Sequence, residues 1–223
     1  NNQRMKSYPG GFLMFSWSGS AKTMRGRSAP FIVCDEVDGY DKSTEGHPVS
    51  LLWQRAATFG DRRKLLEIST PTIKNASWIE SAFEAGDRRY FYVPCPHCGE
   101  GQTLRWSNVI WDEGKPETAR YACESCGALW NDGERIAAIR KGEWVASDPF
   151  TGHASYHLNE MYSCFRKLGD IAQSFLEKKH TNDLQTFVNV SLAETWEEQG
   201  EGVEEHVIKQ RAEDWGDKVP EQV

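Results

Sequence analysis

The sequence predicts an α/β fold that carries an inserted zinc-binding ribbon, and three features support this prediction. The first is an apolar run at 31–34 that ends in two acids, Asp35 and Glu36. The second is another short apolar run at 64–69 that leads into small hydroxyl residues. The third is a pair of Cys-x-x-Cys-Gly motifs further along the chain. The first two predict neighbouring strands, and the third predicts a small metal-bound unit.

The two acids follow a buried strand and would therefore lie at its tip. In α/β proteins that hydrolyse nucleotides, an Asp at this place holds Mg²⁺ through its water shell, and the next Glu polarises the attacking water. We therefore predict Asp35 and Glu36 as catalytic residues, with Asp35 also binding the cofactor's metal. Apolar runs also end in acids by chance at the start of loops, and this motif alone leaves that alternative open.

The second strand runs into Ser69-Thr70-Pro71-Thr72, where the proline cannot continue a strand ladder. In helicase-like ATPases, a Ser/Thr motif at the tip of the strand beside the acidic one senses the γ-phosphate and couples hydrolysis to movement. Ser69, Thr70 and Thr72 are therefore the predicted coupling residues. The alternative is a plain strand-to-helix turn in which Thr72 or Asn75 caps the helix, and the two interpretations are compatible.

Four cysteines predict a metal site. Cys95 and Cys98 form one motif, Cys123 and Cys126 form the other, and 24 residues separate the two motifs. Two thiolates on a tight turn can share one tetrahedral Zn²⁺, and the glycine that follows each motif supplies the positive φ of the turn. Because four protein ligands leave no open position, the zinc would be structural. Disulfides are the alternative, but no secretory signal opens the chain.

Composition limits the class of protein further. The chain has 223 residues and a net charge of −7, with no apolar run long enough to span a membrane. From Glu194 to the end, ten acids face three bases, which is typical of a solvated helix or a linker. The chain begins with Asn1 in a polar segment, so we expect it to be a piece of a longer protein. Further elements are predicted from periodicity and end signals: a strand at 12–17, helices at 48–59, 77–85, 131–140 and 168–180, and a strand at 154–159.

With both motifs in place, the chain resembles the large subunit of bacteriophage terminases, in the lambda-like branch. The resemblance covers nearly the whole length. It rests on the acidic strand and its continuation at 31–40, on the Ser/Thr motif at 69–72, and on the run at 87–98 that leads into the first cysteine motif. Tyr156-His157-Leu158-Asn159 and Phe187-Val188-Asn189 also look like the family.

The resemblance implies a fold, a set of roles and a set of partners. The fold would be a partial P-loop-type ATPase sheet with an inserted four-cysteine zinc ribbon. Asp35 and Glu36 would act on ATP with Mg²⁺, and residues 69–72 would couple hydrolysis to DNA translocation. Arg25 and Arg27 would be candidates for phosphate or DNA contact. The implied partners are double-stranded DNA, the terminase small subunit, the portal protein of the prohead and further copies of the chain, in the host cytoplasm and without a membrane.

The same resemblance implies a domain order with two parts missing. Residues 1–89 would be the C-terminal half of an ATPase core, 90–130 the zinc ribbon, 131–199 a remaining ATPase or linker subdomain, and 200–223 an acidic linker toward a nuclease domain. The chain contains no G-x-x-x-x-G-K-[ST] phosphate loop, and the nuclease carboxylates would lie beyond Val223. We therefore expect the chain to be inactive alone. Two alternatives stay open: a helicase-like ATPase of repair or recombination, and a zinc-ribbon binding module without catalysis.

Overall fold

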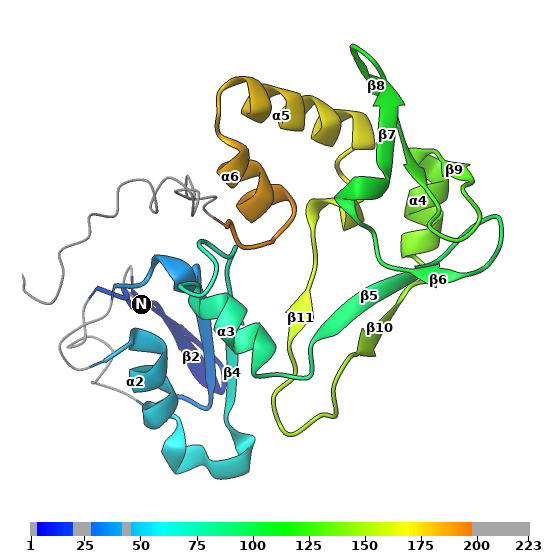
Figure 1. Cartoon of the computed structure of the whole chain (residues 1–223). Helices are drawn as coiled ribbons and strands as arrows, with labels where there is room; N and C mark the ends of the chain where they lie inside the picture. The colour runs from blue at the N-terminus through cyan, green and yellow to red at the C-terminus, as the bar shows by residue number, and fades with distance from the viewer. Residues whose placement is uncertain (1–3, 20–27, 42–45, 198–223) are drawn as a thin grey trace, which may run out of the picture.

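The computed structural model describes residues 4–19, 28–41 and 46–197, which form a mixed α/β structure. Figure 1 shows the elements up to α3 on one side and the elements from β5 onward on the other. We call these the first lobe (residues 4–84) and the second lobe (residues 89–188). The described strands form four separate sheets, two in each lobe.

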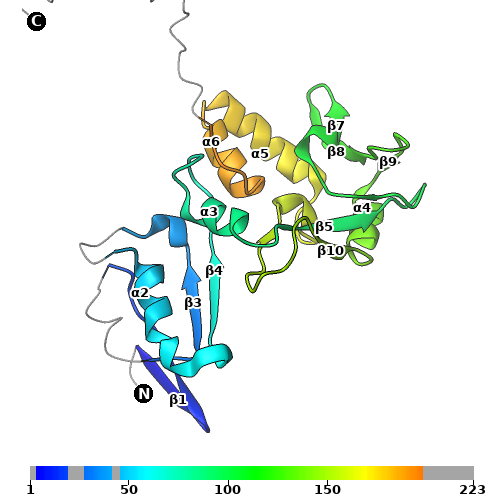
Figure 2. The same ribbon diagram turned by 60° about the horizontal axis from the view of Figure 1, so that its bottom comes forward.

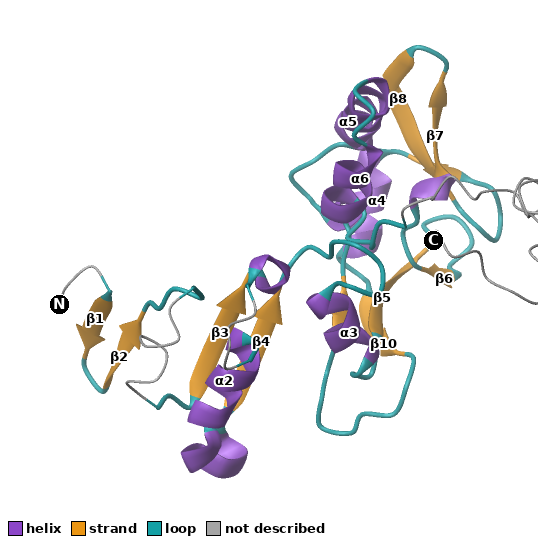
Figure 3. Ribbon diagram, turned by 60° about the vertical axis from the view of Figure 1, so that its left-hand side comes forward, coloured by secondary structure: helices purple, strands orange, loops and turns teal. Residues whose placement is uncertain are grey.

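The first lobe holds one antiparallel hairpin and one parallel pair of strands. The hairpin joins β1 (Met5–Tyr8) to β2 (Gly11–Met14), and the parallel pair joins β3 (Phe31–Asp35) to β4 (Lys64–Ile68). Figure 3 shows both pairs, with α2 (Pro48–Arg55) beside the parallel pair. The register places Asp35 opposite Ile68, so both strands end at one edge.

Alternation along the parallel pair separates a buried face from an exposed one. Cys34 is buried against Val37 and Val49, with Ile32 and Leu65 packed around them. The opposite face presents large apolar side chains that are 46–68% exposed: Phe31, Val33, Leu66 and Ile68. Parallel strands are usually covered on both faces. Within the described residues, however, this sheet is covered on one face only.

A short helix, α3 (Trp78–Glu84), follows the Ser/Thr segment and closes the first lobe. Its N-cap is Ser77, whose hydroxyl accepts the backbone N–H of Glu80 at 3.1 Å. Thr72 and Asn75, the caps considered from the sequence, do not cap it, because the chain makes a further turn at Asn75 (φ +64°) before the helix begins.

The second lobe is built on β5 (Arg89–Pro94), which pairs with three other strands. β10 (Glu143–Ala146) and β6 (Gly101–Gln102) pair with it antiparallel, and β11 (Tyr156–His157) pairs with it parallel. A separate antiparallel sheet follows in the order β7 (Val109–Asp112), β8 (Lys115–Ala122) and β9 (Leu129–Trp130). The larger hydrophobic core lies here and contains buried side chains such as Val93, Leu104, Tyr121, Trp130, Met161, Ile171 and Phe187.

Two helices pack on this core and are tied to each other by a buried arginine. α4 (Asp132–Ile139) begins with a capping box formed by Asn131 and Glu134, and α5 (Leu168–His180) buries residues at helical spacing. Arg135 is fully buried and donates to the carbonyl oxygens of Met161, Ser163 and Arg166, and to the Asp132 carboxylate. These bonds fix the chain between β11 and α5 to helix α4.

The last described segment returns to the first lobe. α6 (Leu184–Thr186) continues into a π-helical turn at Phe187–Ser191, and the chain then runs back toward α3. Trp196 forms a parallel bridge with Ile73, close to the end of β4. Figures 1 and 2 both show the end of the described chain, after α6, beside the loop that joins β4 to α3. In the part of the chain that the structure describes, no helix has the length and apolar character needed to cross a membrane.

Candidate functional site

The two acids predicted as catalytic project from a turn whose neighbours are buried. Cys34 and Val37, on either side, are 1% and 0% exposed, while Asp35 and Glu36 are both exposed. Glu36 has φ +56°, a left-handed conformation that costs a non-glycine residue about 1–3 kcal/mol. The buried anchors hold the chain while the strained turn points both carboxylates outward. Cys34 itself is a core residue, and its burial, with the charge of Glu67 as a smaller cause, raises its pKa to about 11.

The Ser/Thr segment lies at the same edge as the acids, and Asp38 joins the two. The backbone N–H of Asp38 donates to the Ser69 hydroxyl at 3.2 Å, and the Thr72 hydroxyl donates to the Asp38 carboxylate at 2.8 Å. The Ser69 hydroxyl in turn donates to the Thr70 carbonyl at 2.9 Å. The structure therefore brings together the acidic turn and all three residues predicted for coupling.

Asp38 also holds the start of α3. The other oxygen of its carboxylate accepts the backbone N–H of Ile79 at 2.7 Å, in the first turn of that helix. A carboxylate is stabilised at a helix N-terminus because the N–H groups there lack partners within the helix. Sequence reasoning did not single out Asp38 as a site residue. The available signal was an acid two positions after Glu36, but its partners lie 31 to 41 residues away.

Thr72 is held from its other side by the returning C-terminal segment. Its carbonyl oxygen accepts the side-chain amide of Asn189 at 2.7 Å and the backbone N–H of Trp196 at 2.8 Å. The backbone N–H of Lys74 donates back to the Trp196 carbonyl at 3.0 Å. The same Asn189 amide also donates to the Glu194 carbonyl at 2.9 Å. Arg25 and Arg27, the other residues considered for phosphate or DNA contact, lie outside the described residues.

The four predicted metal ligands form one cluster. All four sulfur atoms lie within 4.8 Å of one another, and the pairs Cys95–Cys126 and Cys98–Cys123 are each 3.9 Å apart. A tetrahedral zinc site with sulfur ligands at about 2.3 Å requires sulfur atoms about 3.8 Å apart, whereas a disulfide requires about 2 Å. The four thiols therefore fit a tetrahedral soft metal ion, and the disulfide alternative does not fit this geometry.

The two Cys-x-x-Cys-Gly motifs have matching backbone turns, and their surroundings favour thiolates. Gly99 and Gly127 both have positive φ, at +81° and +71°, as the sequence predicts. The Cys123 sulfur accepts the side-chain amide of Gln102 at 3.2 Å, from a strand of the neighbouring sheet. Burial opposes ionisation of Cys123, but hydrogen bonds from the backbone and from Gln102 outweigh it and lower its pKa to about 6. His97 is not a ligand and instead lies 3.3 Å from the Glu134 carboxylate on α4.

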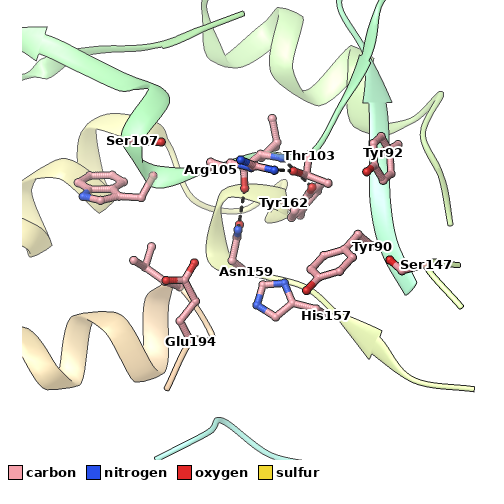
Figure 4. Close-up of a pocket in the computed structure, with 13 residues that line it drawn as sticks. Tyr90, Tyr92, Thr103, Arg105, Ser107, Ser147, His157, Asn159, Tyr162 and Glu194 are labelled. Atoms are coloured by element: carbon pink, nitrogen blue, oxygen red, sulfur yellow. Dashed lines mark hydrogen bonds between the residues drawn. The ribbon is translucent and has the colours of Figure 1, made fainter. Parts of the chain in front are cut away.

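A separate pocket of about 660 Å³ lies between β5, the segment Thr103–Ser107 and the chain around Glu194. Figure 4 shows Tyr90, His157 and Asn159 side by side along its wall. Burial raises the pKa of Tyr90 and lowers the pKa of His157, which favours the neutral form of each side chain. The residues predicted for catalysis, coupling or metal binding do not line this pocket, which therefore adds a cavity that the sequence did not indicate.

Comparisons with known proteins assign the chain to a family. The model of the ATPase domain of the phage terminase large subunit gpA matches residues 1–144, which include the acidic turn, the Ser/Thr segment and all four clustered cysteines. The model of the endonuclease domain of the same subunit matches residues 153–223. The boundary between the two models falls inside the stretch 131–199 that the sequence treats as one subdomain, and ahead of the acidic stretch 200–223.

Two curated relatives cover the whole chain. The terminase large subunit of Enterobacteria phage P21 is 30% identical over 261 aligned residues, and that of Escherichia phage lambda is 28% identical over 263. The chain spans 39% of the length of each relative. No solved structure matches the chain significantly. Since the ATPase-domain model alone covers well over half of the sequence, the chain belongs to the family of phage terminase large subunits of the gpA type.

Proposed function

We propose that the chain is part of a viral DNA-packaging motor. In this motor, a terminase large subunit hydrolyses ATP to move duplex DNA into a prohead and cuts concatemeric DNA. One observation carries the proposal: at a single sheet edge, two exposed acids and a Ser/Thr segment are joined by the hydrogen bonds of Asp38. Contact of this kind gives a direct route by which hydrolysis at the acids could move the Ser/Thr segment.

The residues at this edge have chemically distinct roles. Asp35 would hold Mg²⁺ of the ATP complex, and the ion when bound would neutralise charge on the phosphates. The exposed Glu36 carboxylate would orient and polarise an attacking water. Ser69, Thr70 and Thr72 would change contacts as the γ-phosphate leaves, because two of these hydroxyls already bond to the loop that carries the acids.

The decisive test is the ATPase rate of a full-length subunit that contains this sequence, with and without linear duplex DNA. Glu36→Gln should abolish DNA-stimulated hydrolysis and leave the fold intact. Glu84→Gln is the matched control, since Glu84 is an exposed acid on α3 away from the turn. Hydrolysis that responds neither to DNA nor to Glu36→Gln would exclude the motor and favour a zinc module without catalysis.

The cysteine cluster supports a structural Zn²⁺ site. The ion would be held by Cys95, Cys98, Cys123 and Cys126, and its binding energy would become folding energy of the second lobe. Metal analysis should find one zinc per chain, lost in Cys123→Ser and kept in Cys164→Ser, which alters an exposed cysteine outside the cluster. A chelator should first raise hydrogen exchange between residues 90 and 130. Unchanged exchange there would contradict the structural role.

The remaining proposals concern partners. Double-stranded DNA, the small subunit, the portal of the prohead and further copies of the subunit would meet this protein in the host cytoplasm. The ribbon region favours a protein contact over a phosphate backbone, because it carries exposed acids: Glu100, Glu113, Glu117 and Glu124. A pull-down of DNA by the ribbon region at physiological salt would argue against this assignment.

A further inference from the structure

Thr72 has bonds on two sides that lead to different parts of the chain. Its hydroxyl donates to Asp38, next to the acidic turn, and its carbonyl accepts from Asn189 and Trp196. The first contact belongs to the stretch matched by the ATPase model and the second to the stretch matched by the endonuclease model. One residue of the Ser/Thr segment therefore bonds to both.

The Asn189 side chain is held in one orientation. Its amide nitrogen donates to the Thr72 and Glu194 carbonyl oxygens at 2.7 and 2.9 Å. The residue is 8% exposed, so water does not replace these bonds readily. The Thr72 carbonyl, with two lone pairs, is fully used by Asn189 and Trp196.

The backbone around Asn189 is irregular in a way that allows this contact. It lies in the π-helical turn at Phe187–Ser191, and Ala193 just after it has φ +55°. π turns and positive φ at non-glycine residues carry a cost and often mark functional positions. Here the two irregularities bring the Asn189 amide and the Trp196 backbone to the same carbonyl.

Other side-chain bonds at this junction are more exposed to solvent than those of Asn189. Lys74 and Glu197 form an exposed ion pair at 2.9 Å, and such pairs contribute little. The Thr195 hydroxyl donates to Glu80 on α3 at 2.7 Å. The buried amide of Asn189 is therefore the contact whose loss should matter most for the attachment of residues 189–196 to Thr72.

We propose that Asn189 is a positioning residue that links the Ser/Thr segment to the endonuclease-matched part of the chain, so that the nucleotide state at the acidic turn sets the placement of the nuclease. The inference rests on the proposed function, because it requires residues 69–72 to respond to hydrolysis. A shift of Thr72 would pass from Asp38 through its own backbone to Asn189 and Trp196, since the same residue carries both sets of bonds.

The mechanical link is tested first in the 223-residue chain, without nucleotide. Asn189→Asp keeps the shape but removes the donors, and it should speed hydrogen exchange of the Lys74 and Trp196 amides about tenfold. Asn159→Asp is the matched control, because Asn159 has similar burial and its side chain bonds to Leu104 and Met161, not to Thr72, Asn189 or Trp196. It should leave both amides unchanged.

Transmission requires a second observation from the opposite side. Asp38→Asn, which alters the carboxylate that Thr72 contacts, should also speed exchange of the Trp196 amide. If Asp38→Asn has no effect there, or if Asn159→Asp has as large an effect as Asn189→Asp, no specific link exists and the proposal is wrong.

The functional arm uses a full-length subunit that contains this sequence and compares DNA cleavage with ATP and with ADP. Asn189→Asp should bring the ATP-to-ADP cleavage ratio close to one, whereas Asn159→Asp should keep the wild-type ratio. A general loss of nuclease competence cancels in this ratio. Thr72→Val, which breaks the bond to Asp38 but keeps the carbonyl, should also bring the ratio closer to one and gives a second route if Asn189→Asp fails to fold.

The outcomes separate the two proposals. A wild-type subunit with neither ATPase nor cleavage activity refutes the proposed function, and the role of Asn189 falls with it. Both activities present, together with an unchanged ratio in Asn189→Asp and Thr72→Val, refute the link while the motor assignment stands.

Discussion

Replacing Asp38 with alanine tests the hydrogen-bonded junction at the centre of the proposed site. The carboxylate accepts from the Thr72 hydroxyl at 2.8 Å and from the Ile79 backbone at 2.7 Å. Bonds to a charged acceptor are worth about 1.5–3 kcal/mol each, and Asp38 is half-buried beside an exposed Thr72, so the lower value applies. The free energy of unfolding of the first lobe should therefore fall by about 3 kcal/mol. This figure includes the stabilisation of the start of α3 by the Asp38 charge.

Two assays measure this loss directly. Hydrogen exchange of the Ile79 amide should speed by about a hundredfold, since about 1.4 kcal/mol corresponds to a factor of ten and the whole first lobe opens more often. A double-mutant cycle with Thr72→Val should give a coupling energy of about 1 kcal/mol. Asp41→Ala, an exposed acid three residues further on, is the control. Unchanged Ile79 exchange together with additive mutations would refute the junction as described.

Two further predictions concern the second lobe, and a third concerns Asp87, just before it. Gln102→Leu removes a donor to the Cys123 sulfur and should weaken retention of the proposed zinc about 10-fold or more in a competition with a chelator, while residues 90–130 stay folded in excess zinc. Arg135→Met leaves three backbone carbonyls without a donor and should lower the free energy of unfolding by about 3–5 kcal/mol in urea, whereas Arg140→Met, exposed at the end of the same helix, should change it little. The hydrogen bond from Arg89 lowers the pKa of the Asp87 carboxyl. The ionised Asp87 therefore stabilises the fold at neutral pH, and this stabilisation is lost as pH falls through the lowered pKa of Asp87. In Asp87→Asn, stability measured in urea should depend less on pH below about 4 than in wild type.

Much of the local structure follows from sequence because its signals are local. The capping residue Asn131, the strand that ends just before Ser69, and the spacing of α5 all lie within one element or one turn of it. The cysteine cluster can be predicted from the sequence equally well. Each Cys-x-x-Cys-Gly motif fixes two cysteines on one turn, and only the meeting of the two motifs is long-range. Strand ends were less accurate: the strand expected at 12–17 ends at Met14 and pairs in a hairpin.

The junction around Thr72 could not be predicted in the same way. Asn189 lies 117 residues from the carbonyl it contacts, and no periodicity or capping pattern connects two such positions. The run Phe187-Val188-Asn189 contributes to the family resemblance but predicts no contact, because a polar residue beside apolar ones has no unique structural meaning. The role of Asp38 could not be predicted for a similar reason. Its partners are Ser69, just after β4, and Ile79 on α3, and they meet Asp38 only in the folded chain.

The two lobes differ in how much of their stability they supply themselves, and this difference explains the position of the junction. Among the described residues, the second lobe has a large core, whereas the buried core of the first lobe is centred on Cys34, Val37 and Val49 and leaves one face of β3–β4 exposed. A small core with an uncovered parallel sheet is open to local unfolding at low cost. Segment 189–197 adds hydrogen bonds to this weaker lobe at Thr72 and Lys74, beside the acidic turn. Contacts that stabilise a marginal element also bias its conformation, so the attachment that secures the Ser/Thr segment is the one through which its movement would reach the rest of the chain.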